Sequence, residues 1–296
     1  MRVGVVILPD LRWPDALARW REAEAIGFST AWTYDHLSWR TLRDGPWLGA
    51  VPLLAGVAAA TTTLRLGTLV TSPNFRHPAL LAKDVMTLDE ISAGRIDLGI
   101  GAGGTGFDAD VLGEPPLSAR ERVDRFVEFV DALDVLLREP AASLQGHSYT
   151  VVESRTYPGC TQHPRVPFTI AAAGPRALAV AARHGASWVT YGARDPLAEP
   201  AEWFDALATQ TRSLDAACHN AKRDPATLRR EVLIGLDLHF AQRTIAAWDE
   251  VVGRLAELGF SDVVVHWPRP KDPDLPGPHP LIFDEICARL AASPGG

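Results

Sequence analysis

The chain has 296 residues, 47% of them hydrophobic and 22% charged, which is the composition of a globular protein and excludes a wholly disordered chain. Its 36 acidic and 29 basic side chains give a formal net charge of −7, so the surface repels phosphate backbones and we expect no nucleic-acid partner. The longest mainly apolar stretch, residues 47–60, is shorter than the about 20 residues that span a bilayer, so we expect no membrane partner.

The amino-terminal run and the cysteines indicate the compartment. The first apolar run meets Pro9 and Asp10 at once, unlike a secretory signal, and the three cysteines lie far apart without a C-x-x-C pair. An odd number of dispersed cysteines is typical of a reducing environment. We therefore expect a cytoplasmic protein.

Short apolar runs rich in β-branched residues alternate along the chain with longer segments of helical periodicity. Eight strands each followed by a helix predict a (β/α)₈ TIM barrel, and because no linker or repeat divides the chain we expect one domain over residues 1–296. Residues 139–166 and 268–280 are predicted as long loops. The predicted strands are 3–8, 29–34, 64–70, 95–100, 167–172, 187–191, 231–239 and 262–267, and the predicted helices are 14–26, 47–60, 78–92, 118–138, 175–184, 200–220, 244–258 and 280–292.

The residues that follow each predicted strand are the candidates for function, because the active site of such a barrel lies at the carboxyl ends of its strands. Asp35 and His36 follow the second strand. A histidine donates or accepts a proton near neutral pH, which makes His36 the best catalytic candidate. From position alone, a histidine that only hydrogen-bonds a neighbouring loop is an equal alternative.

Glycines follow the fourth predicted strand in a pattern that matches G-x-G-x-x-G twice, at Gly99/Gly101/Gly104 and at Gly101/Gly103/Gly106. No helix begins on the last glycine, so we reject a dinucleotide-binding fingerprint. Backbone without side chains at a strand end lets a flat ring approach closely, although a tight turn alone is also sufficient reason for the glycines.

A second candidate cofactor segment is Ala173-Gly174-Pro175, which stands between a predicted strand and a predicted helix. Free backbone amides at a helix N-terminus attract phosphate, and Arg176 could add charge, but from position alone an ordinary strand-to-helix turn is favoured. The scattered histidines have no metal-ligand spacing, so we expect no metal site. The chain has no G-x-S-x-G motif, which excludes a hydrolase with that nucleophile elbow.

Several blocks in a specific order resemble the bacterial luciferase-like flavin oxidoreductase and monooxygenase family, and are most similar to its branch that uses the deazaflavin coenzyme F420. The resemblance covers nearly the whole chain. The blocks are Ala31-Trp-Thr-Tyr-Asp-His-Leu37, Leu64-Arg-Leu-Gly-Thr-Leu-Val70, Arg76-His-Pro-Ala-Leu-Leu-Ala-Lys83, Thr87-Leu-Asp-Glu-Ile-Ser-Ala-Gly-Arg95, Leu98-Gly-Ile-Gly-Ala-Gly103, Ile170-Ala-Ala-Ala-Gly-Pro175 and Trp188-Val-Thr-Tyr191.

The resemblance implies a luciferase-like barrel with an insertion between strand 4 and strand 5, where residues 139–166 lie. It implies a flavin or deazaflavin ring at the barrel mouth, supported by a bulge in strand 3 and by a non-proline cis peptide at Leu69-Val70. It also implies that His36 handles a proton with support from Asp35, and that the chain forms a homodimer. The cofactor contacts that it implies are His36, Leu69, Val70, Thr71, Gly101, Gly103, Ala173, Gly174, Pro175, Arg176 and Thr190.

One position departs from the family pattern. Sugar-phosphate dehydrogenases of this family have Glu after the strand-4 glycines, where this chain has Gly104, so sugar-phosphate oxidation is disfavoured. Trp39, Phe75 and Phe107 lie in predicted loops and Trp267 ends the last predicted strand, and these apolar side chains favour an uncharged substrate. We therefore expect hydride transfer between reduced F420 and a small uncharged organic substrate. The alternatives are a monooxygenase that uses reduced FMN and dioxygen, and a flavin-binding carrier or sensor without catalytic activity.

Overall fold

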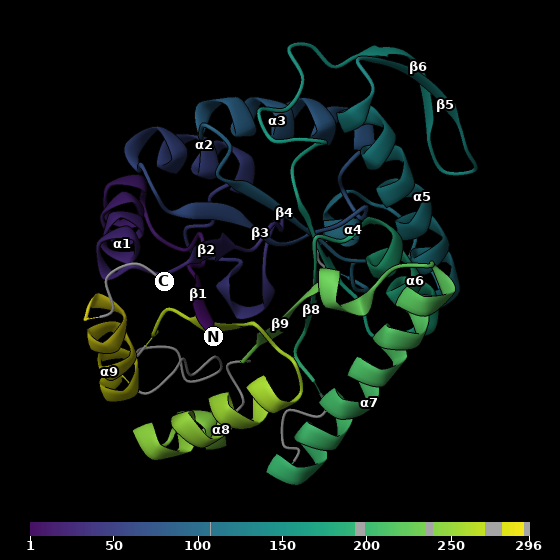
Figure 1. Cartoon of the computed structure of the whole chain (residues 1–296). Helices are drawn as coiled ribbons and strands as arrows, with labels where there is room; N and C mark the ends of the chain where they lie inside the picture. The colour runs from purple at the N-terminus through teal and green to yellow at the C-terminus, as the bar shows by residue number, and fades with distance from the viewer. Residues whose placement is uncertain (107, 193–198, 235–238, 270–279, 293–296) are drawn as a thin grey trace.

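Eight parallel strands close into a barrel and an outer ring of helices surrounds it (Figure 1). The computed structural model describes residues 1–106, 108–192, 199–234, 239–269 and 280–292. Neighbouring strands follow the order β1-β10-β9-β8-β7-β4-β3-β2, so the predicted (β/α)₈ barrel is confirmed. The barrel strands are β1 Arg2–Val6, β2 Thr30–Thr33, β3 Arg65–Thr71, β4 Ile96–Ile100, β7 Phe168–Ala171, β8 Ser187–Thr190, β9 Arg229–Leu233 and β10 Asp262–His266.

The helices begin and end close to where their sequence signals stand. At the start of α5 the Ser118 hydroxyl accepts the Glu121 N–H at 3.3 Å and the Glu121 carboxylate accepts the Ser118 N–H at 2.8 Å, which is the expected capping box. The outer helices are α1 Trp13–Ile26, α2 Ala50–Ala60, α3 Pro78–Ile91, α5 Ala119–Arg138, α6 Pro175–His184, α7 Pro200–Asn220, α8 Ile245–Glu257 and α9 Pro280–Ala291. Shorter helical segments are η1 Arg40–Leu42, α4 Asp108–Val111, η2 Pro225–Thr227 and η3 His239–Gln242.

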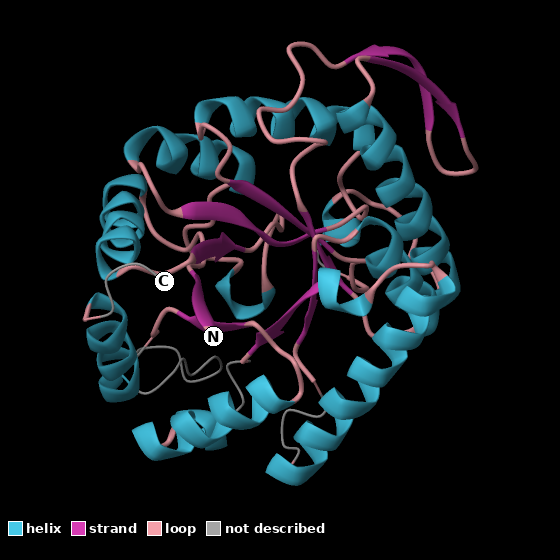
Figure 2. Cartoon of the chain, viewed as in Figure 1, coloured by secondary structure: helices cyan, strands magenta, loops and turns pink. Residues whose placement is uncertain are grey.

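The expected insertion between the fourth and fifth barrel strands is present, but it is not all loop as predicted. Strands β5 Ala141–Gln145 and β6 Thr150–Arg155 form an antiparallel hairpin that extends beyond the ring of helices (Figures 1 and 2). The hairpin pairs only with itself and is largely exposed, so its sequence carries no apolar run. The Glu128 carboxylate of α5 accepts the Ser148 and Tyr149 N–H groups and fixes the hairpin turn to the barrel body.

The seventh barrel strand is shorter than predicted. The sequence predicts a strand over residues 231–239, but β9 ends at Leu233, one residue after Val232 pairs with Thr190 of β8. The length of a barrel strand is set by its two partners, and the apolar residues after Leu233 gave no sign of this end. Asp237, which the prediction placed on the strand, lies outside the described residues, and His239 begins η3.

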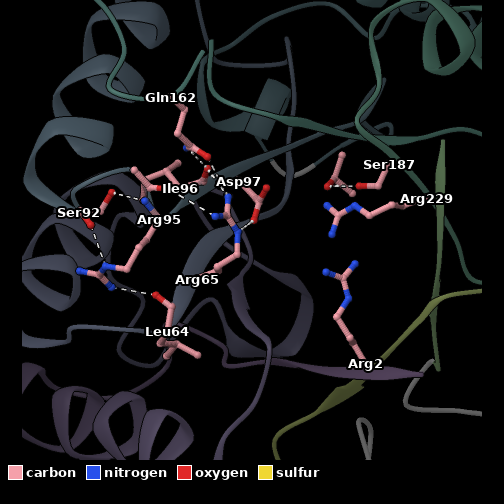
Figure 3. A network of polar contacts seen from close by, with 12 residues as sticks. Arg2, Leu64, Arg65, Ser92, Arg95, Ile96, Asp97, Gln162, Ser187 and Arg229 are labelled. Atoms are coloured by element: carbon pink, nitrogen blue, oxygen red, sulfur yellow. Dashed lines mark hydrogen bonds and ion pairs between the residues drawn. The ribbon is translucent and has the colours of Figure 1, made fainter. Parts of the chain in front are cut away.

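Paired charges lie at the amino-terminal end of the barrel, where Figure 3 shows Arg65 bonded to Asp97, with Arg2 and Arg229 in the same view. Arg65 Nε lies 2.6 Å from the Asp97 carboxylate and Arg2 Nε lies 2.9 Å from that of Asp262. Burial keeps such carboxylates paired, because an isolated charge in the interior is costly. The third buried carboxylate of this group, Glu231, lies 3.7 Å from Arg229.

Candidate active site

The opposite, carboxyl end of the barrel opens into a pocket of about 710 Å³, a size typical of sites for small molecules and cofactors. Its walls come from the ends of six strands, from the glycine-rich connection after β4 and from the first turn of α6. The pocket is lined by Tyr34, His36, Trp39, Arg40, Leu69, Val70, Ser72, Asn74, Gly101, Ala102, Gly103, Gly104, Thr105, Gly106, Asp108, Ala119, Arg122, Val123, Ala171, Ala172, Ala173, Gly174, Ala177, Val189, Thr190, Tyr191, Gly192, Gln210 and Leu233.

One wall of the pocket is apolar and is shaped by β3. The Leu69-Val70 peptide bond is cis, as predicted, and the pairing of β3 with β4 shifts register between Thr68 and Thr71. A Cβ on Gly101 would lie 2.7 Å from Val70 Cγ2, so only glycine allows the two strands this approach. Leu69 and Val70 belong to a hydrophobic cluster that continues around the barrel to Val189. The result is a side-chain wall of branched aliphatic groups against which a flat ring can lie.

His36 stands in the pocket wall with its ring held on two sides. Its Nδ1 lies 2.7 Å from Oδ2 of Asp108, and its ring stacks on that of Trp39 with centroids 4.4 Å apart. The Trp47 indole N–H donates to the His36 carbonyl at 2.8 Å and fixes the backbone. The side chain keeps 20% exposure, so the ring is oriented and still accessible from the pocket.

Asp35 does not support His36 directly, and that part of the prediction is wrong. Its buried carboxylate accepts the Thr71 hydroxyl at 2.6 Å and two N–H groups of Arg76 at 2.7 and 3.0 Å. Asp35 and Thr71 therefore lie behind the pocket wall and tie the end of β2 to the end of β3 and to the segment before α3. The side chains of the neighbours Asp35 and His36 therefore have different partners, Thr71 and Arg76 for Asp35 and Asp108 for His36.

Asp108 is the functional candidate that the sequence reasoning missed. It is the first residue of the short helix α4 in a stretch predicted as irregular, and its carboxylate is buried. A carboxylate a few residues after a glycine-rich strand end was the available signal, but nothing in the sequence showed that it returns to β2.

The start of α6 offers backbone N–H groups to the pocket. Gly174 is the N-cap residue and lines the pocket with Ala173, while Pro175 has no N–H, so the free donors are those of Arg176 and Ala177. A Cβ on Gly174 would meet nothing within 4 Å. The Arg176 side chain does not line the pocket, and its guanidinium is paired with Asp124 of α5, so its role as a cofactor contact stays a prediction.

The remaining predicted residues divide between the pocket and the structure around it. Thr190 lines the pocket, but its hydroxyl donates to Gln210 at 2.6 Å and accepts the Gly192 N–H. Of the apolar loop residues, Trp39 lines the pocket, whereas Trp267 packs against Phe28 and Phe283. Phe75 is not among the residues that line the pocket, and the Arg76 guanidinium lies over its ring. Phe107 lies outside the described residues.

Tyr34 adds a phenol to the pocket, hydrogen-bonded to a buried histidine of β10. Its hydroxyl lies 2.9 Å from Nε2 of His266. Burial lowers the pKa of His266 to about 4, and the positive charge of Arg269 acts in the same direction. His266 is therefore neutral at physiological pH and serves as a fixed hydrogen-bond partner for Tyr34.

The glycine-rich connection after β4 is held by Asn74. Its amide donates to the Gly104 carbonyl at 3.0 Å and its oxygen accepts Arg125 at 2.7 Å. Gly103 has a φ of 74°, and a Cβ there would lie 2.6 Å from Asn74. Gly104, in contrast, has open space around its Cβ position.

Neither a metal-binding cluster nor a membrane-spanning helix is present in the described residues. Within the ranges that the structure describes, no three His, Cys, Asp or Glu side chains gather as a metal site. None of the helices in those ranges is long and apolar enough to cross a membrane.

The pocket lies where parallel barrels carry their active sites, and it combines an apolar wall with an accessible, oriented histidine, which is the arrangement of a barrel enzyme that binds a small molecule or cofactor. The chain belongs to the luciferase-like monooxygenase family, whose sequence model matches residues 1–273. The resemblance noted in the sequence is thereby confirmed, and with it the class of flavin- or deazaflavin-dependent oxidoreductases.

Relatives of known activity include F420-dependent enzymes. The chain is 31% identical over 278 residues to an F420-dependent hydroxymycolic acid dehydrogenase of Mycobacterium tuberculosis (strain ATCC 25618 / H37Rv), a match covering 90% of this chain and 69% of the relative. It is 33% identical over 177 residues to an F420-dependent glucose-6-phosphate dehydrogenase of Beutenbergia cavernae, covering 59% of this chain but only 52% of that protein.

Among solved structures, an F420-dependent secondary alcohol dehydrogenase in complex with an F420-acetone adduct superposes with a TM-score of 0.76 over 97% of both chains. The sequence identity is 20%, so this likeness establishes the fold.

Proposed function

We propose that this chain transfers a hydride between reduced F420 and a small uncharged organic substrate, with His36 as the residue that moves the accompanying proton. The observation that carries the proposal is the setting of His36. Its Nδ1 is held by Asp108 and its ring by Trp39, while the side chain remains accessible in the pocket wall. The F420-dependent relatives support the choice of cofactor.

The residues of the pocket fit such a cofactor. The aliphatic wall around Leu69 and Val70 suits a flat ring. The N–H groups at the start of α6 suit a phosphate beside Gly174, because this residue has no side chain and the space at its Cβ position is empty. When bound, the deazaflavin supplies the carbon that donates or accepts the hydride. The proposed cofactor contacts are His36, Leu69, Val70, Gly101, Gly103, Ala173, Gly174 and Thr190.

The chain itself contributes orientation and a proton path. His36 presents Nε2 as its free ring nitrogen, the atom that gives a proton to, or takes one from, the substrate oxygen. Gly104 brings no carboxylate to the pocket, so His36 carries this task without the acidic residue of the sugar-phosphate dehydrogenases. We include the expected homodimer in this proposal, to be checked by analytical ultracentrifugation.

The test is single-turnover hydride transfer by His36→Ala at saturating F420. General acid–base catalysis contributes about 10²–10⁴-fold, so the transfer rate should fall by that order. F420 affinity, measured by quenching of tryptophan fluorescence, should change far less. His219→Ala is the matched control, because His219 is exposed on α7 and its ring bonds the Asp215 carbonyl of its own helix. Equal rates in His36→Ala and the parent protein would refute the assignment.

An FMN-dependent monooxygenase is the second candidate, because the apolar wall accepts either ring and the matching family is named for monooxygenases. Parallel titrations with F420 and FMN, followed by substrate turnover under nitrogen and under air, separate the two. Turnover only with FMN and dioxygen would replace the first proposal, and binding without any turnover would favour a carrier.

A further inference from the structure

We propose that Asp108 is the positioning residue of this site and that it fixes which ring nitrogen of His36 carries the proton. The inference rests on the proposed function, in which His36 moves the proton. Asp108 is a buried carboxylate with 2% side-chain exposure, and both of its oxygens are engaged: Oδ2 lies 2.7 Å from His36 Nδ1, and Oδ1 accepts the Leu37 N–H at 2.7 Å.

The two contacts together determine the tautomer. An ionised carboxylate only accepts hydrogen bonds, so His36 Nδ1 must be the donor. A neutral imidazole has one N–H, and Nε2 is then the nitrogen with the free lone pair. The Leu37 N–H, from the residue next to His36, holds the carboxylate in register with the ring. Asp108 therefore presets His36 as a base at Nε2, and as an acid at the same atom after it takes a proton.

The fold brings Asp108 to this place along a path pinned by other residues. After β4 the chain runs through the glycine-rich connection, whose Gly104 carbonyl is held by Asn74, and then enters α4 at Asp108. The carboxylate thus reaches the residues after β2 from the glycine-rich connection, which also lines the pocket. Trp39 stacks on the ring with planes 28° apart. The ring is held by Asp108 at one edge and by Trp39 on one face.

Replacement of Asp108 by asparagine makes a specific prediction. The Leu37 N–H still needs an acceptor, so the amide oxygen faces Leu37 and the amide NH₂ faces His36. The NH₂ group can only donate, which forces Nδ1 to become the acceptor and moves the ring proton to Nε2. The isosteric Asp108→Asn protein should fold and yet present the wrong tautomer, the general consequence of replacing a carboxylate that orients a catalytic histidine.

The experiment is a long-range ¹H–¹⁵N correlation of the imidazole nitrogens in the full chain at about pH 8, with the His36 signals assigned by their loss in His36→Gln. We expect the Nδ1–H form in the parent protein and the Nε2–H form in Asp108→Asn. Asp110→Asn is the matched control, since Asp110 is an exposed carboxylate of the same short helix. It should keep the parent tautomer and the parent rate.

Single-turnover hydride transfer gives the second readout. Asp108→Asn should slow transfer by about 10²–10⁴-fold, the range of general acid–base catalysis, with F420 affinity little changed. An Nε2–H form in the parent protein overturns the inference whether or not any variant folds. So does an unchanged tautomer in Asp108→Asn, even if His36→Ala is slow. If the tautomer switches as expected but neither Asp108→Asn nor His36→Ala slows transfer, the positioning role in catalysis fails together with the proposed function.

Discussion

Replacing Glu231 by glutamine should make the folded barrel more stable above neutral pH. Glu231 is fully buried at the amino-terminal end of the barrel, and burial, followed by the negative charge of Asp262, raises its pKa to about 7 from an ordinary 4.5. The Arg229 guanidinium at 3.7 Å and the Ser187 hydroxyl act in the opposite direction without cancelling the effect. The folded protein thus retains a proton that the unfolded chain releases.

The magnitude follows from the two pKa values. Between pH 4.5 and about 7 the folded state binds more protons at Glu231 than the unfolded state, so the free energy of unfolding falls as pH rises through this window. Each pH unit between the two values corresponds to about 1.4 kcal/mol, so ionising the group costs the fold about 3 kcal/mol above pH 7. Glu231→Gln keeps the shape without the charge and should recover most of this amount.

Urea denaturation at about pH 5 and at about pH 8 measures the effect. Glu257→Gln, an exposed change on α8 with the same loss of charge, is the control and should follow the parent protein. Glu231→Gln should match the parent at the lower pH and exceed it by about 3 kcal/mol at the higher. A parent-like fall in stability between the two pH values in Glu231→Gln would show that Glu231 does not titrate in the fold.

The barrel could be predicted from the sequence because its signals are local. Buried parallel strands are apolar on both faces and outer helices repeat an apolar stripe, so alternation alone indicated the architecture. The ends of elements that depend on partners could not be predicted. The length of β9 is set by β8 and β10, and the hairpin of β5 and β6 meets the core only through single residues such as Leu144 and Val151, so neither strand is a continuous apolar run.

The site was predictable to the extent that backbone defines it. The cis bond at Leu69-Val70 and the open helix start at Gly174 are backbone features, and the family resemblance carried both. Side-chain partners across the barrel were not predictable, since they join residues distant in sequence. The Arg176 guanidinium pairs with Asp124, 52 positions away in the sequence. The His36 imidazole pairs with Asp108, 72 positions away, and not with the adjacent Asp35.

The glycines of the pocket give two further predictions. Gly103→Ala should destabilise the fold by about 1–2 kcal/mol, because the φ of Gly103 is positive and the new Cβ would meet the Asn74 side chain. Gly104→Ala is the control and should leave the melting temperature unchanged, because the space around Gly104 is open. Equal changes in melting temperature for the two variants would refute this distinction. Gly174→Glu should fold, since its Cβ meets nothing within 4 Å, and so should its control Gly174→Ala. The added carboxylate at the α6 N-terminus would occupy the site proposed for the cofactor phosphate and would repel the phosphate by its negative charge. Two like charges about 4 Å apart near a protein surface repel by about 4 kcal/mol, so F420 affinity should fall by two to three orders of magnitude in Gly174→Glu. Affinity is read from tryptophan quenching, and equally tight binding by the Glu and Ala variants would place the phosphate elsewhere.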